Sequence, residues 1–391
     1  MNNLPLSGIK VVEIAHIVAG PTAGLILGDL GAEVIKIEPP NALDTSRIGS
    51  SRNGSFFFVN RNKSSIVIDL KNPEGLEILY KILEDTDVLI ENMAPGTMNR
   101  LGIGYKQLST KFSKLIYLSV KGFLSGPYSN QTSLDELAQM GSGLAYMTGR
   151  SGDPIRAGAS IVDMGAAMHG IIGVLSALYT RSITQKGQEI TSGLFETALF
   201  FVGQHMAFNQ HTGNANVPLP ERHHGWGVYD KFQCIDGELV FIGVTSNNQW
   251  NTFCRILELK ELANNPELEN NPGRIANRPL ILKTVTPIIE NMESTRILDM
   301  LRDNGISATL VHTPDTVITD QHVNSGKRLY KFTSDGKDFA LPKLPYESSD
   351  YEFDESLPAP DKPGLQTNSI LKKMGYSDTQ ISKFFDDNIV Q

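Results

Sequence analysis

The sequence predicts an α/β protein whose large domain contains a parallel sheet and whose second, smaller domain is α+β. The first observation is a β-α-β pattern between residues 9 and 38. The second is the alternation of short β-rich runs with helical patterns up to residue 120. The third is a change of pattern near residue 212, after which Asp236-Gly237 separates two alternating runs. Alternating strands and helices build a parallel sheet covered by helices, whereas the Asp-Gly pair predicts an antiparallel hairpin.

The elements of the large domain are predicted from apolar periodicity and turn residues. Strands are expected at residues 9–15, 32–38, 65–69, 87–91 and 115–120, and helices at 22–30, 73–86, 105–112, 163–185 and 195–211. Residues 213–220 form a linker, followed by the hairpin strands at 229–235 and 238–244. Helices at 248–257, 279–292 and 294–304, with a strand at 307–312, complete the smaller domain. We therefore divide the chain into residues 1–212, 213–329 and 330–391.

Composition limits the possible functions. With 35 basic and 43 acidic residues in 391, the net charge of −8 argues against a nucleic-acid partner bound through a broad basic face. Cys234 and Cys254 lack metal-ligand or disulfide spacing, which favours a reducing cytoplasm. The adjacent His223 and His224 are weak evidence for zinc, and no metal site is predicted. No export signal is expected, and residues 164–179 are interpreted as a buried helix too short to span a membrane.

Asp163 is the most informative single residue. It lies in a segment of small and apolar residues, Gly158 to Gly170, at the predicted start of a long helix. An acid in this position can cap the helix, because the positive helix end favours a carboxylate. Alternatively, the small neighbours allow a substrate to approach the carboxylate closely, as a catalytic acid or nucleophile requires. Both interpretations follow from this segment alone.

Several ordered motifs resemble those of class III CoA-transferases, the family of formyl-CoA:oxalate and carnitine CoA-transferases. The motifs are Gly8-Ile-Lys-Val-Val-Glu-Ile-Ala-His16-Ile-Val-Ala-Gly20-Pro21, Leu27-Gly-Asp-Leu-Gly-Ala-Glu-Val-Ile-Lys-Ile-Glu38, Asn60-Arg-Asn-Lys-Ser64, Asp69-Leu-Lys-Asn-Pro-Glu-Gly75, Glu91-Asn-Met-Ala-Pro-Gly96, Arg100-Leu-Gly102, Lys121-Gly122 and Gly126-Pro127. The resemblance covers nearly the whole chain, and Asp163 lies where the family carries its catalytic aspartate.

The resemblance implies a Rossmann-like large domain that residues 330–391 complete, and a homodimer of two interlocked rings. It also implies that Asp163 attacks an acyl-CoA thioester and becomes an aspartyl-CoA thioester. A coenzyme A thioester is then a substrate, a small carboxylic acid is the second substrate, and no tightly bound cofactor is expected. The donor favoured here is succinyl-CoA or another short dicarboxylyl-CoA, with oxalate or a larger acid as acceptor.

Individual positions follow from the same resemblance. Residues expected to line the CoA groove are Val18, Ile68, Lys71, Asn92, Met93, Arg100 and Leu101. Residues expected in the substrate pocket are His16, Arg47, Gly49, Leu134, Gly225, Trp226 and Gly227. Backbone amides near Gly20, Gly165 or the 225–227 loop would stabilise an oxyanion, and residues 223–227 would form the covering loop. Two positions depart from the oxalate enzymes: Pro39 replaces an arginine, and Ile48-Gly49 leaves more room than a tryptophan.

Three other functions remain open. A 2-methylacyl-CoA racemase of the same superfamily would need a histidine where this chain has Leu134-Asp135. A nicotinamide dehydrogenase would need Gly-x-Gly-x-x-Gly, whereas Gly20, Gly24 and Gly28 are spaced by four and suggest close helix packing. A CoA-binding protein without catalysis is the third. For the acceptor's second carboxylate, the nearby cations are Arg47, Arg52 and Arg61.

Overall fold

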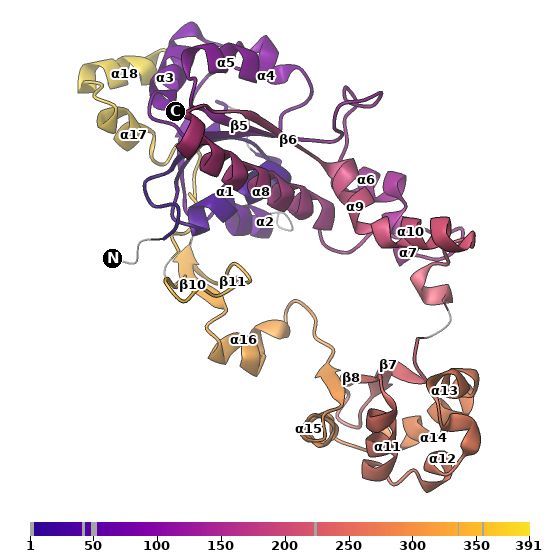
Figure 1. Cartoon of the computed structure of the whole chain (residues 1–391). Helices are drawn as coiled ribbons and strands as arrows, with labels where there is room; N and C mark the ends of the chain where they lie inside the picture. The colour runs from indigo at the N-terminus through magenta and orange to yellow at the C-terminus, as the bar shows by residue number, and fades with distance from the viewer. Residues whose placement is uncertain (1–3, 41–43, 48–52, 223–224, 335, 354–355) are drawn as a thin grey trace. The chain divides into compact units, whose positions relative to one another are not determined.

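The central element is a six-stranded sheet in the order β3-β2-β1-β4-β5-β6, with every pair parallel (Figure 1). Its strands are β1 (Lys10–Ile14), β2 (Glu33–Glu38), β3 (Lys63–Val67), β4 (Val88–Glu91), β5 (Ile116–Lys121) and β6 (Glu189–Gly193). The chain reverses its direction of progress across the sheet between β1 and β4. In open parallel sheets, ligands bind beyond the carboxyl ends of the strands at such a switch point.

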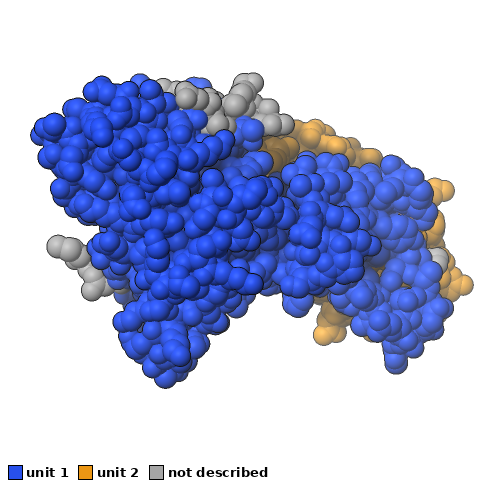
Figure 2. All heavy atoms as spheres, turned by 90° about the horizontal axis from the view of Figure 1, so that it is seen from above, with its two compact units in different colours: residues 1–220, 325–391 blue, residues 221–324 orange. Residues whose placement is uncertain are grey.

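This computed structural model describes residues 4–40, 44–47, 53–222, 225–334, 336–353 and 356–391. They divide into two compact units, coloured separately in Figure 2. Unit 1 contains residues 1–220 and 325–391, and unit 2 contains residues 221–324. The sequence analysis placed the two boundaries at 212/213 and 329/330. Both differ by a few residues from the boundaries of the compact units.

Helices cover both faces of the sheet because its strands alternate their buried side chains between two apolar clusters. One face packs on α1 (Ala19–Asp29) and α8 (Ile161–Thr184) through Val11, Ile90 and Leu118. The other packs on α3 (Pro73–Leu83), α17 (Thr367–Lys373) and α18 (Asp378–Asp386). The remaining helices of unit 1 are α2 (Asn53–Val59), α4 (Thr97–Arg100), α5 (Tyr105–Lys111), α6 (Asp135–Ser142), α7 (Leu144–Thr148), α9 (Leu194–Phe201) and α10 (Gly203–Thr212). The fold class predicted from the sequence is confirmed at this level.

Helix α1 rests on a buried group of charges at the end of the first strands. The Glu13 carboxylate accepts hydrogen bonds from Lys36 Nζ at 3.1 Å and Lys63 Nζ at 2.6 Å, and all three side chains are almost fully buried. Lys36 Nζ also lies 3.4 Å from Asp44. A Cβ atom on Gly24 would lie 1.9 Å from the Glu13 carboxylate, so this glycine is needed for close packing. The predicted close-packing role of the helix glycines is confirmed here.

Helix α8 is held close to its neighbours by glycines on its buried face. A Cβ atom on Gly165 would lie 2.7 Å from Phe201, and one on Gly173 would lie 2.7 Å from Ile190. By length and composition alone, the 24-residue helix is long and apolar enough to cross a membrane, which the shorter segment predicted from sequence was not. Its opposite face exposes a helical stripe of large apolar side chains: Met168, Ile172, Leu175, Tyr179 and Ile183.

The C-terminal segment seals the edge strand β3. After the hairpin of β10 (Leu329–Ser334) and β11 (Lys337–Pro342), the chain runs alongside β3. The side chains of Gln366 and Thr367 accept the N–H groups of Ser65 and Val67 at 2.8 and 3.3 Å. The Asp69 N–H donates to the Ile389 carbonyl at 2.8 Å. These contacts satisfy backbone groups that an edge strand would otherwise expose.

Unit 2 contains a three-stranded antiparallel sheet in the order β7-β8-β9. Its strands are β7 (Val228–Gln233), β8 (Leu239–Val244) and β9 (Ser307–Leu310), so the predicted Asp-Gly hairpin is confirmed. Its helices are α11 (Asn247–Ile256), α12 (Lys260–Ala263), α13 (Asn271–Ala276), α14 (Arg278–Ile289) and α15 (Ser294–Asp303), and α16 (Gln321–Ser325) follows. Trp250 and Phe253 lie in the core of this unit.

Several features differ from the sequence prediction, among them the short helices α2, α4, α6 and α7, and three of the differences have a clear local cause. The single helix expected at 195–211 is two helices, α9 and α10, because the first ends with Val202 as its C-cap. Strand β6 was not predicted, because Glu-Ile-Thr-Ser-Gly has one large apolar residue, as befits an edge strand. The β10–β11 hairpin was also missed, because its alternation is irregular and the prolines of this region favoured a loop.

Candidate active site

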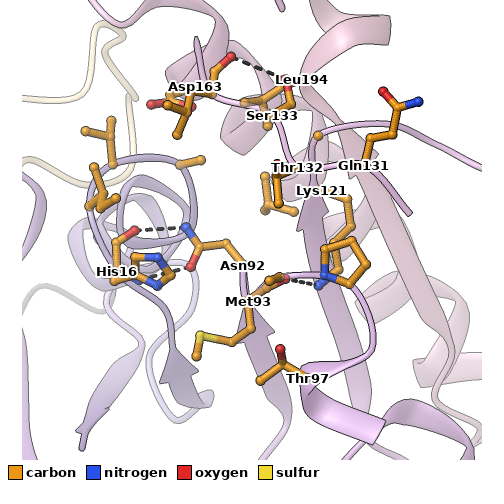
Figure 3. Close-up of a pocket in the computed structure, with 18 residues that line it drawn as sticks. His16, Asn92, Met93, Thr97, Lys121, Gln131, Thr132, Ser133, Asp163 and Leu194 are labelled. Atoms are coloured by element: carbon orange, nitrogen blue, oxygen red, sulfur yellow. Dashed lines mark hydrogen bonds between the residues drawn. The ribbon is translucent and has the colours of Figure 1, made fainter. Parts of the chain in front are cut away.

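A cavity of about 350 Å³ lies at the switch point between β1 and β4 (Figure 3). All its residues belong to unit 1. They are His16, Ile17, Val18, Ala19, Asn92, Met93, Ala94, Pro95, Thr97, Val120, Lys121, Gly122, Gln131, Thr132, Ser133, Leu134, Asp163 and Leu194. The cavity is lined by the segments that follow β1, β4 and β5, together with the first turn of α8. Loops after parallel strands thus provide most of the lining, as this fold predicts.

The loops after β1 and β4 are joined by one side-chain amide. Asn92 Nδ2 donates to the His16 carbonyl at 2.8 Å, and Asn92 Oδ1 accepts the His16 N–H at 3.0 Å. Figure 3 shows these two bonds spanning the lower part of the cavity. Because the amide satisfies both backbone groups of one residue, it fixes the separation of the two loops.

The loop after β1 contains a strained residue. Ile17 has φ of 67°, which is rare for a β-branched residue. Its N–H faces the Asp44 carboxylate, with oxygens at 3.2 and 3.3 Å. The pKa of Asp44 is held below its usual value: burial raises it, but the charge of Lys36 and hydrogen bonds from Ser46 and Ile17 outweigh that effect. An anchored, strained residue at a cavity is a known feature of functional sites.

An ion pair holds the segment after β4 that lines the cavity. Lys121 Nζ lies 2.7 Å from the buried Glu91 carboxylate and donates to the Met93 carbonyl, also at 2.7 Å. The Ser119 hydroxyl also donates to Glu91. Lys121 therefore holds the segment after β4 in place, and its charge is already partnered.

Asp163 projects into the cavity from the first turn of α8 (Figure 3). Burial, and secondarily the charge of Asp135, raise the pKa of the Asp163 carboxyl from 3.8 to about 7. Burial lowers the pKa of His16 on the same cavity, so its imidazole is neutral near neutral pH. A carboxylate destabilised in this way is more basic, and hence a better nucleophile, than an ordinary aspartate.

The amino end of α1 also faces the cavity. Val18 is its N-cap and Ala19 its first residue, and both line the cavity. The first N–H groups of a helix have no partner within it, and the helix dipole gives this end a partial positive charge. This end can therefore bind a phosphate or a developing oxyanion.

The structure brings together six of the residues predicted from sequence. His16, Val18, Asn92, Met93, Leu134 and Asp163 line one cavity. Arg100 lies beside it on α4, where Nη2 donates to Thr97 Oγ1 at 2.9 Å. Leu101 packs on the apolar cluster of the sheet, Ile68 is fully buried, and Lys71 lies before α3. None of these last three lines the cavity, and Gly49 lies outside the described residues.

Two of the three arginines suggested for a second carboxylate, Arg47 and Arg61, are held elsewhere by acids. Arg47 pairs with Glu38 at 2.8 Å, and its side chain is largely buried over Phe56. Arg61 pairs with Asp29 at 2.6 Å and is buried. Neither lines the cavity, whereas the sequence placed Arg47 in the substrate pocket. Arg52 lies outside the described residues.

The loop 225–227 belongs to unit 2 and is anchored there. The Gly225 carbonyl accepts a bond from Asn271 Nδ2 at 2.8 Å, and the Gly227 carbonyl accepts one from Arg278 Nη1 at 2.8 Å. The Trp226 ring lies 5.0 Å from the ring of Tyr229. These contacts hold Trp226 and Tyr229 together within unit 2. The described part of the covering loop is thus positioned by its own unit.

Sequence reasoning missed several polar residues of the cavity. Lys121 ends β5, and Gln131, Thr132 and Ser133 precede α6. Lys121 could have been found, because it is the last residue of β5, two positions beyond Ser119, which pairs with Glu91 at the end of β4. The segment 131–133 carries no such signal. Within the described residues, no three His, Cys, Asp or Glu side chains are grouped to hold a metal ion.

The resemblance implies that CoA binds in this cavity, and we expect Asn92→Asp to weaken that binding roughly tenfold to a hundredfold. A carboxylate cannot donate to the His16 carbonyl and repels it. Asn92→Ala should lose both bonds and have at least the same effect. Titration calorimetry with CoA measures this change. Asn291→Ala is a control, because that exposed amide bonds only to its own helix in unit 2. Equal affinity in Asn92→Asp and wild type would contradict the role assigned to the loop bridge.

Comparison with known proteins agrees with the family resemblance seen in the sequence. The model of CoA-transferase family III matches residues 6–364. The human protein named succinyl-CoA:glutarate CoA-transferase is 30% identical over 402 residues, covering 100% of this chain and 91% of that protein. Acetyl-CoA:oxalate CoA-transferase of Acetobacter aceti is 32% identical, covering 82% and 86%. The crystal structure of a CaiB/BaiF family protein from Brucella suis has a TM-score of 0.84 at 28% identity, covering 95% and 100%. The chain therefore belongs to the CoA-transferase family III and is a transferase enzyme that acts on CoA thioesters.

Proposed function

We propose that this enzyme transfers CoA from a short acyl-CoA to a free carboxylic acid through an aspartyl-CoA thioester on Asp163. The observation that carries the proposal is a carboxylate of raised pKa in the cavity at the switch point. The carboxylate lies on a fixed helix and near the amino end of α1, so a nucleophile and an electrostatic stabiliser share one site.

The reaction would proceed by balanced exchanges. Ionised Asp163 attacks the thioester carbonyl, the carbon–sulfur bond breaks, and CoA thiolate leaves with the electron pair. The thiolate then attacks the aspartyl carbonyl of the mixed anhydride and releases the donor acid as a carboxylate. The acceptor carboxylate then attacks the aspartyl-CoA thioester and expels CoA thiolate, which leaves a second mixed anhydride. The thiolate attacks the acceptor's acyl carbonyl in this anhydride, forms the new acyl-CoA and releases the Asp163 carboxylate.

Each tetrahedral intermediate between these species carries an oxyanion and a bulky anionic CoA. The unpartnered N–H groups at the start of α1, near Ala19 and Gly20, support their assignment to oxyanion stabilisation. Arg100 is exposed beside Thr97 at the cavity edge, where a guanidinium can reach a CoA phosphate. Val18, Met93 and Leu134 give the cavity an apolar lining for the pantetheine arm of CoA.

The proposed donor is a short dicarboxylyl-CoA, with succinyl-CoA first among them and a dicarboxylic acid as acceptor. The human relative named succinyl-CoA:glutarate CoA-transferase supports this donor, and the names of both relatives given above support a dicarboxylic acid as acceptor. Transfer between two similar acids is nearly balanced in energy, so the enzyme needs only to lower barriers. The hydroxyl-bearing segment 131–133 offers hydrogen-bond donors to a second carboxylate within the cavity.

We further propose a homodimer of interlocked chains. The stripe on α8, with Ile172 62% and Tyr179 73% exposed, continues to Phe200 on α9. Exposed apolar patches of this extent mark association surfaces, and a second copy of the chain would cover them. Analytical ultracentrifugation tests the proposed dimer directly, and a monomer at micromolar concentration would overturn it.

The free thiols of Cys234 and Cys254 support the proposed cytoplasmic location.

Intact-protein mass spectrometry tests the reaction. After brief mixing with a panel of acyl-CoAs, the productive donor should add the mass of CoA less one water to the protein. If CoA binds but no donor yields this adduct, the covalent mechanism is wrong. Release of deuterium from the α-carbon of a 2-methylacyl-CoA, without transfer to an acid, would instead indicate the racemase.

A further inference from the structure

The amino end of α8 is already occupied by a carboxylate from another helix. Asp135 on α6 accepts the N–H of Val162 at 2.9 Å and the N–H of Asp163 at 3.1 Å, both through Oδ2. The helix's own N-cap, Ser160, makes no side-chain capping bond. The positive helix end that would otherwise stabilise ionised Asp163 is therefore satisfied by Asp135.

Asp135 is itself fixed. Its Oδ1 accepts a bond from Gln139 Nε2 at 2.5 Å, and Gln139 Oε1 accepts the N–H of Ala157 at 2.9 Å. Arg156 Nη1 lies 3.8 Å from Asp135 and is 39% exposed, so it compensates the carboxylate only in part. Asp135 is 8% exposed. This carboxylate thus places a buried negative charge one turn from the nucleophile.

We infer that Asp135 is a positioning residue that fixes the backbone of Asp163 and keeps the Asp163 carboxylate basic by withholding the helix end from it. This inference rests on the proposed covalent reaction. A more basic carboxylate attacks a thioester faster, so a device that prevents its stabilisation raises the rate of the first step. Asp135 also bonds the N–H groups of Val162 and Asp163. Without Asp135, these groups would have no partner once the Asp163 side chain turned toward the thioester.

Other charged groups around α8 are accounted for within the described residues. Those on elements that pack against α8 or line the cavity are Asp29, Glu91, Lys121, Glu136, Arg156, Glu189, Glu196 and His16, with His169 and Arg181 on α8 itself, where Arg181 pairs with Asp87. Lys121 is paired with Glu91, Asp29 with Arg61, and the Glu196 carboxylate accepts the Leu124 N–H. Of these carboxylates, Asp135 is the one that bonds the backbone of Asp163.

Asp135→Asn is the direct test, because the amide oxygen can still accept both N–H groups while the charge is removed. The rate of CoA adduct formation on Asp163 should rise with pH through a midpoint near 7 in the wild type. In Asp135→Asn this midpoint should fall by about one pH unit, and the rate above it should drop several-fold. Glu136→Gln is the matched control, since it removes an equal, exposed charge from the next residue of α6. Its midpoint should stay at the wild-type value.

A second measurement keeps the two proposals separable. Carbon-13 NMR titration of aspartate carboxyls, with the Asp163 resonance assigned by its loss in Asp163→Asn, reports the same midpoint without any acyl-CoA. If adduct forms in both proteins with equal midpoints, the inference about Asp135 is overturned and the proposed function stands. If no adduct forms in the wild type while the NMR midpoint still falls, the covalent function fails and the electrostatic role of Asp135 stands.

Discussion

Asp163→Ala should abolish both the CoA adduct and CoA transfer, with a rate loss of roughly 10⁴-fold or more, as for other covalent nucleophiles. The carboxylate is the atom group that would bond to CoA, and no other carboxyl group lines the cavity among the described residues. Intact-mass analysis and acyl exchange with a labelled acid measure the two losses. Asp163→Asn should be equally inactive, because an amide is not a nucleophile for a thioester.

The same variants should be more stable than wild type at pH 8. The pKa of Asp163 is about 7 in the folded protein and 3.8 in the reference state, so the folded state holds the extra proton between these values. Stability from this group therefore falls as pH rises from about 4 to 7. Asp163→Asn removes that loss, and should gain on the order of 2 kcal/mol at pH 8 but nothing at pH 4. Urea denaturation at the two pH values measures the difference.

The outcomes separate catalysis from a capping role. A structural aspartate would make Asp163→Ala less stable at neutral pH and leave activity proportional to folded protein. Retained adduct formation in Asp163→Asn would place the thioester on another residue. Either result would remove Asp163 from the mechanism proposed for this site.

Glu13→Ala should cost about 3–5 kcal/mol of folding free energy, the largest loss expected from one substitution outside the cavity. Glu13 is fully buried and bonds two buried ammonium groups, Lys36 and Lys63. Burial lowers the pKa of Lys63 to about 8 although Glu13 raises it, so this ammonium is already destabilised. Without Glu13, the buried group of Lys36, Lys63 and Asp44 carries one net positive charge.

Asp85→Ala is the matched control, because it also removes one acid from a lysine pair. Its partner is Lys10 at 3.2 Å, and both side chains are well exposed, 80% and 46%. Such exposed pairs contribute about 0–1 kcal/mol. Guanidinium denaturation at one protein concentration compares the two variants. Similar losses in both would mean that the buried group at Glu13 is solvated and contributes little.

The parallel sheet could be predicted because its signals are local, since strands β1 to β5 are β-rich runs. His16 and Asn92 were assigned by the family resemblance, His16 to the substrate pocket and Asn92 to the CoA groove. The structure joins the two residues by a pair of hydrogen bonds, which their local sequence does not show.

Residues defined by distant partners could not be predicted in the same way. Arg61 looks like a surface cation in its own segment, yet Asp29, which buries it, lies 32 positions earlier. Arg47 is likewise held by an ion pair with Glu38 and by a hydrogen bond to the carbonyl of Pro360, 313 positions later. Asp135 carries no local sign of its bonds to the α8 backbone, because α6 and α8 are brought together only by the fold.

The sealing of β3 by residues far along the sequence has a consequence for synthesis on the ribosome. Residues 63–67 are made about 300 positions before the partners that close this edge, at 364–367 and 389–390. Throughout translation of the second unit, the nascent sheet therefore presents an open strand that other chains can pair with. Unit 1 is completed only after unit 2 has been made, and chaperone occupancy of nascent chains should last at least until residues 364–390 emerge.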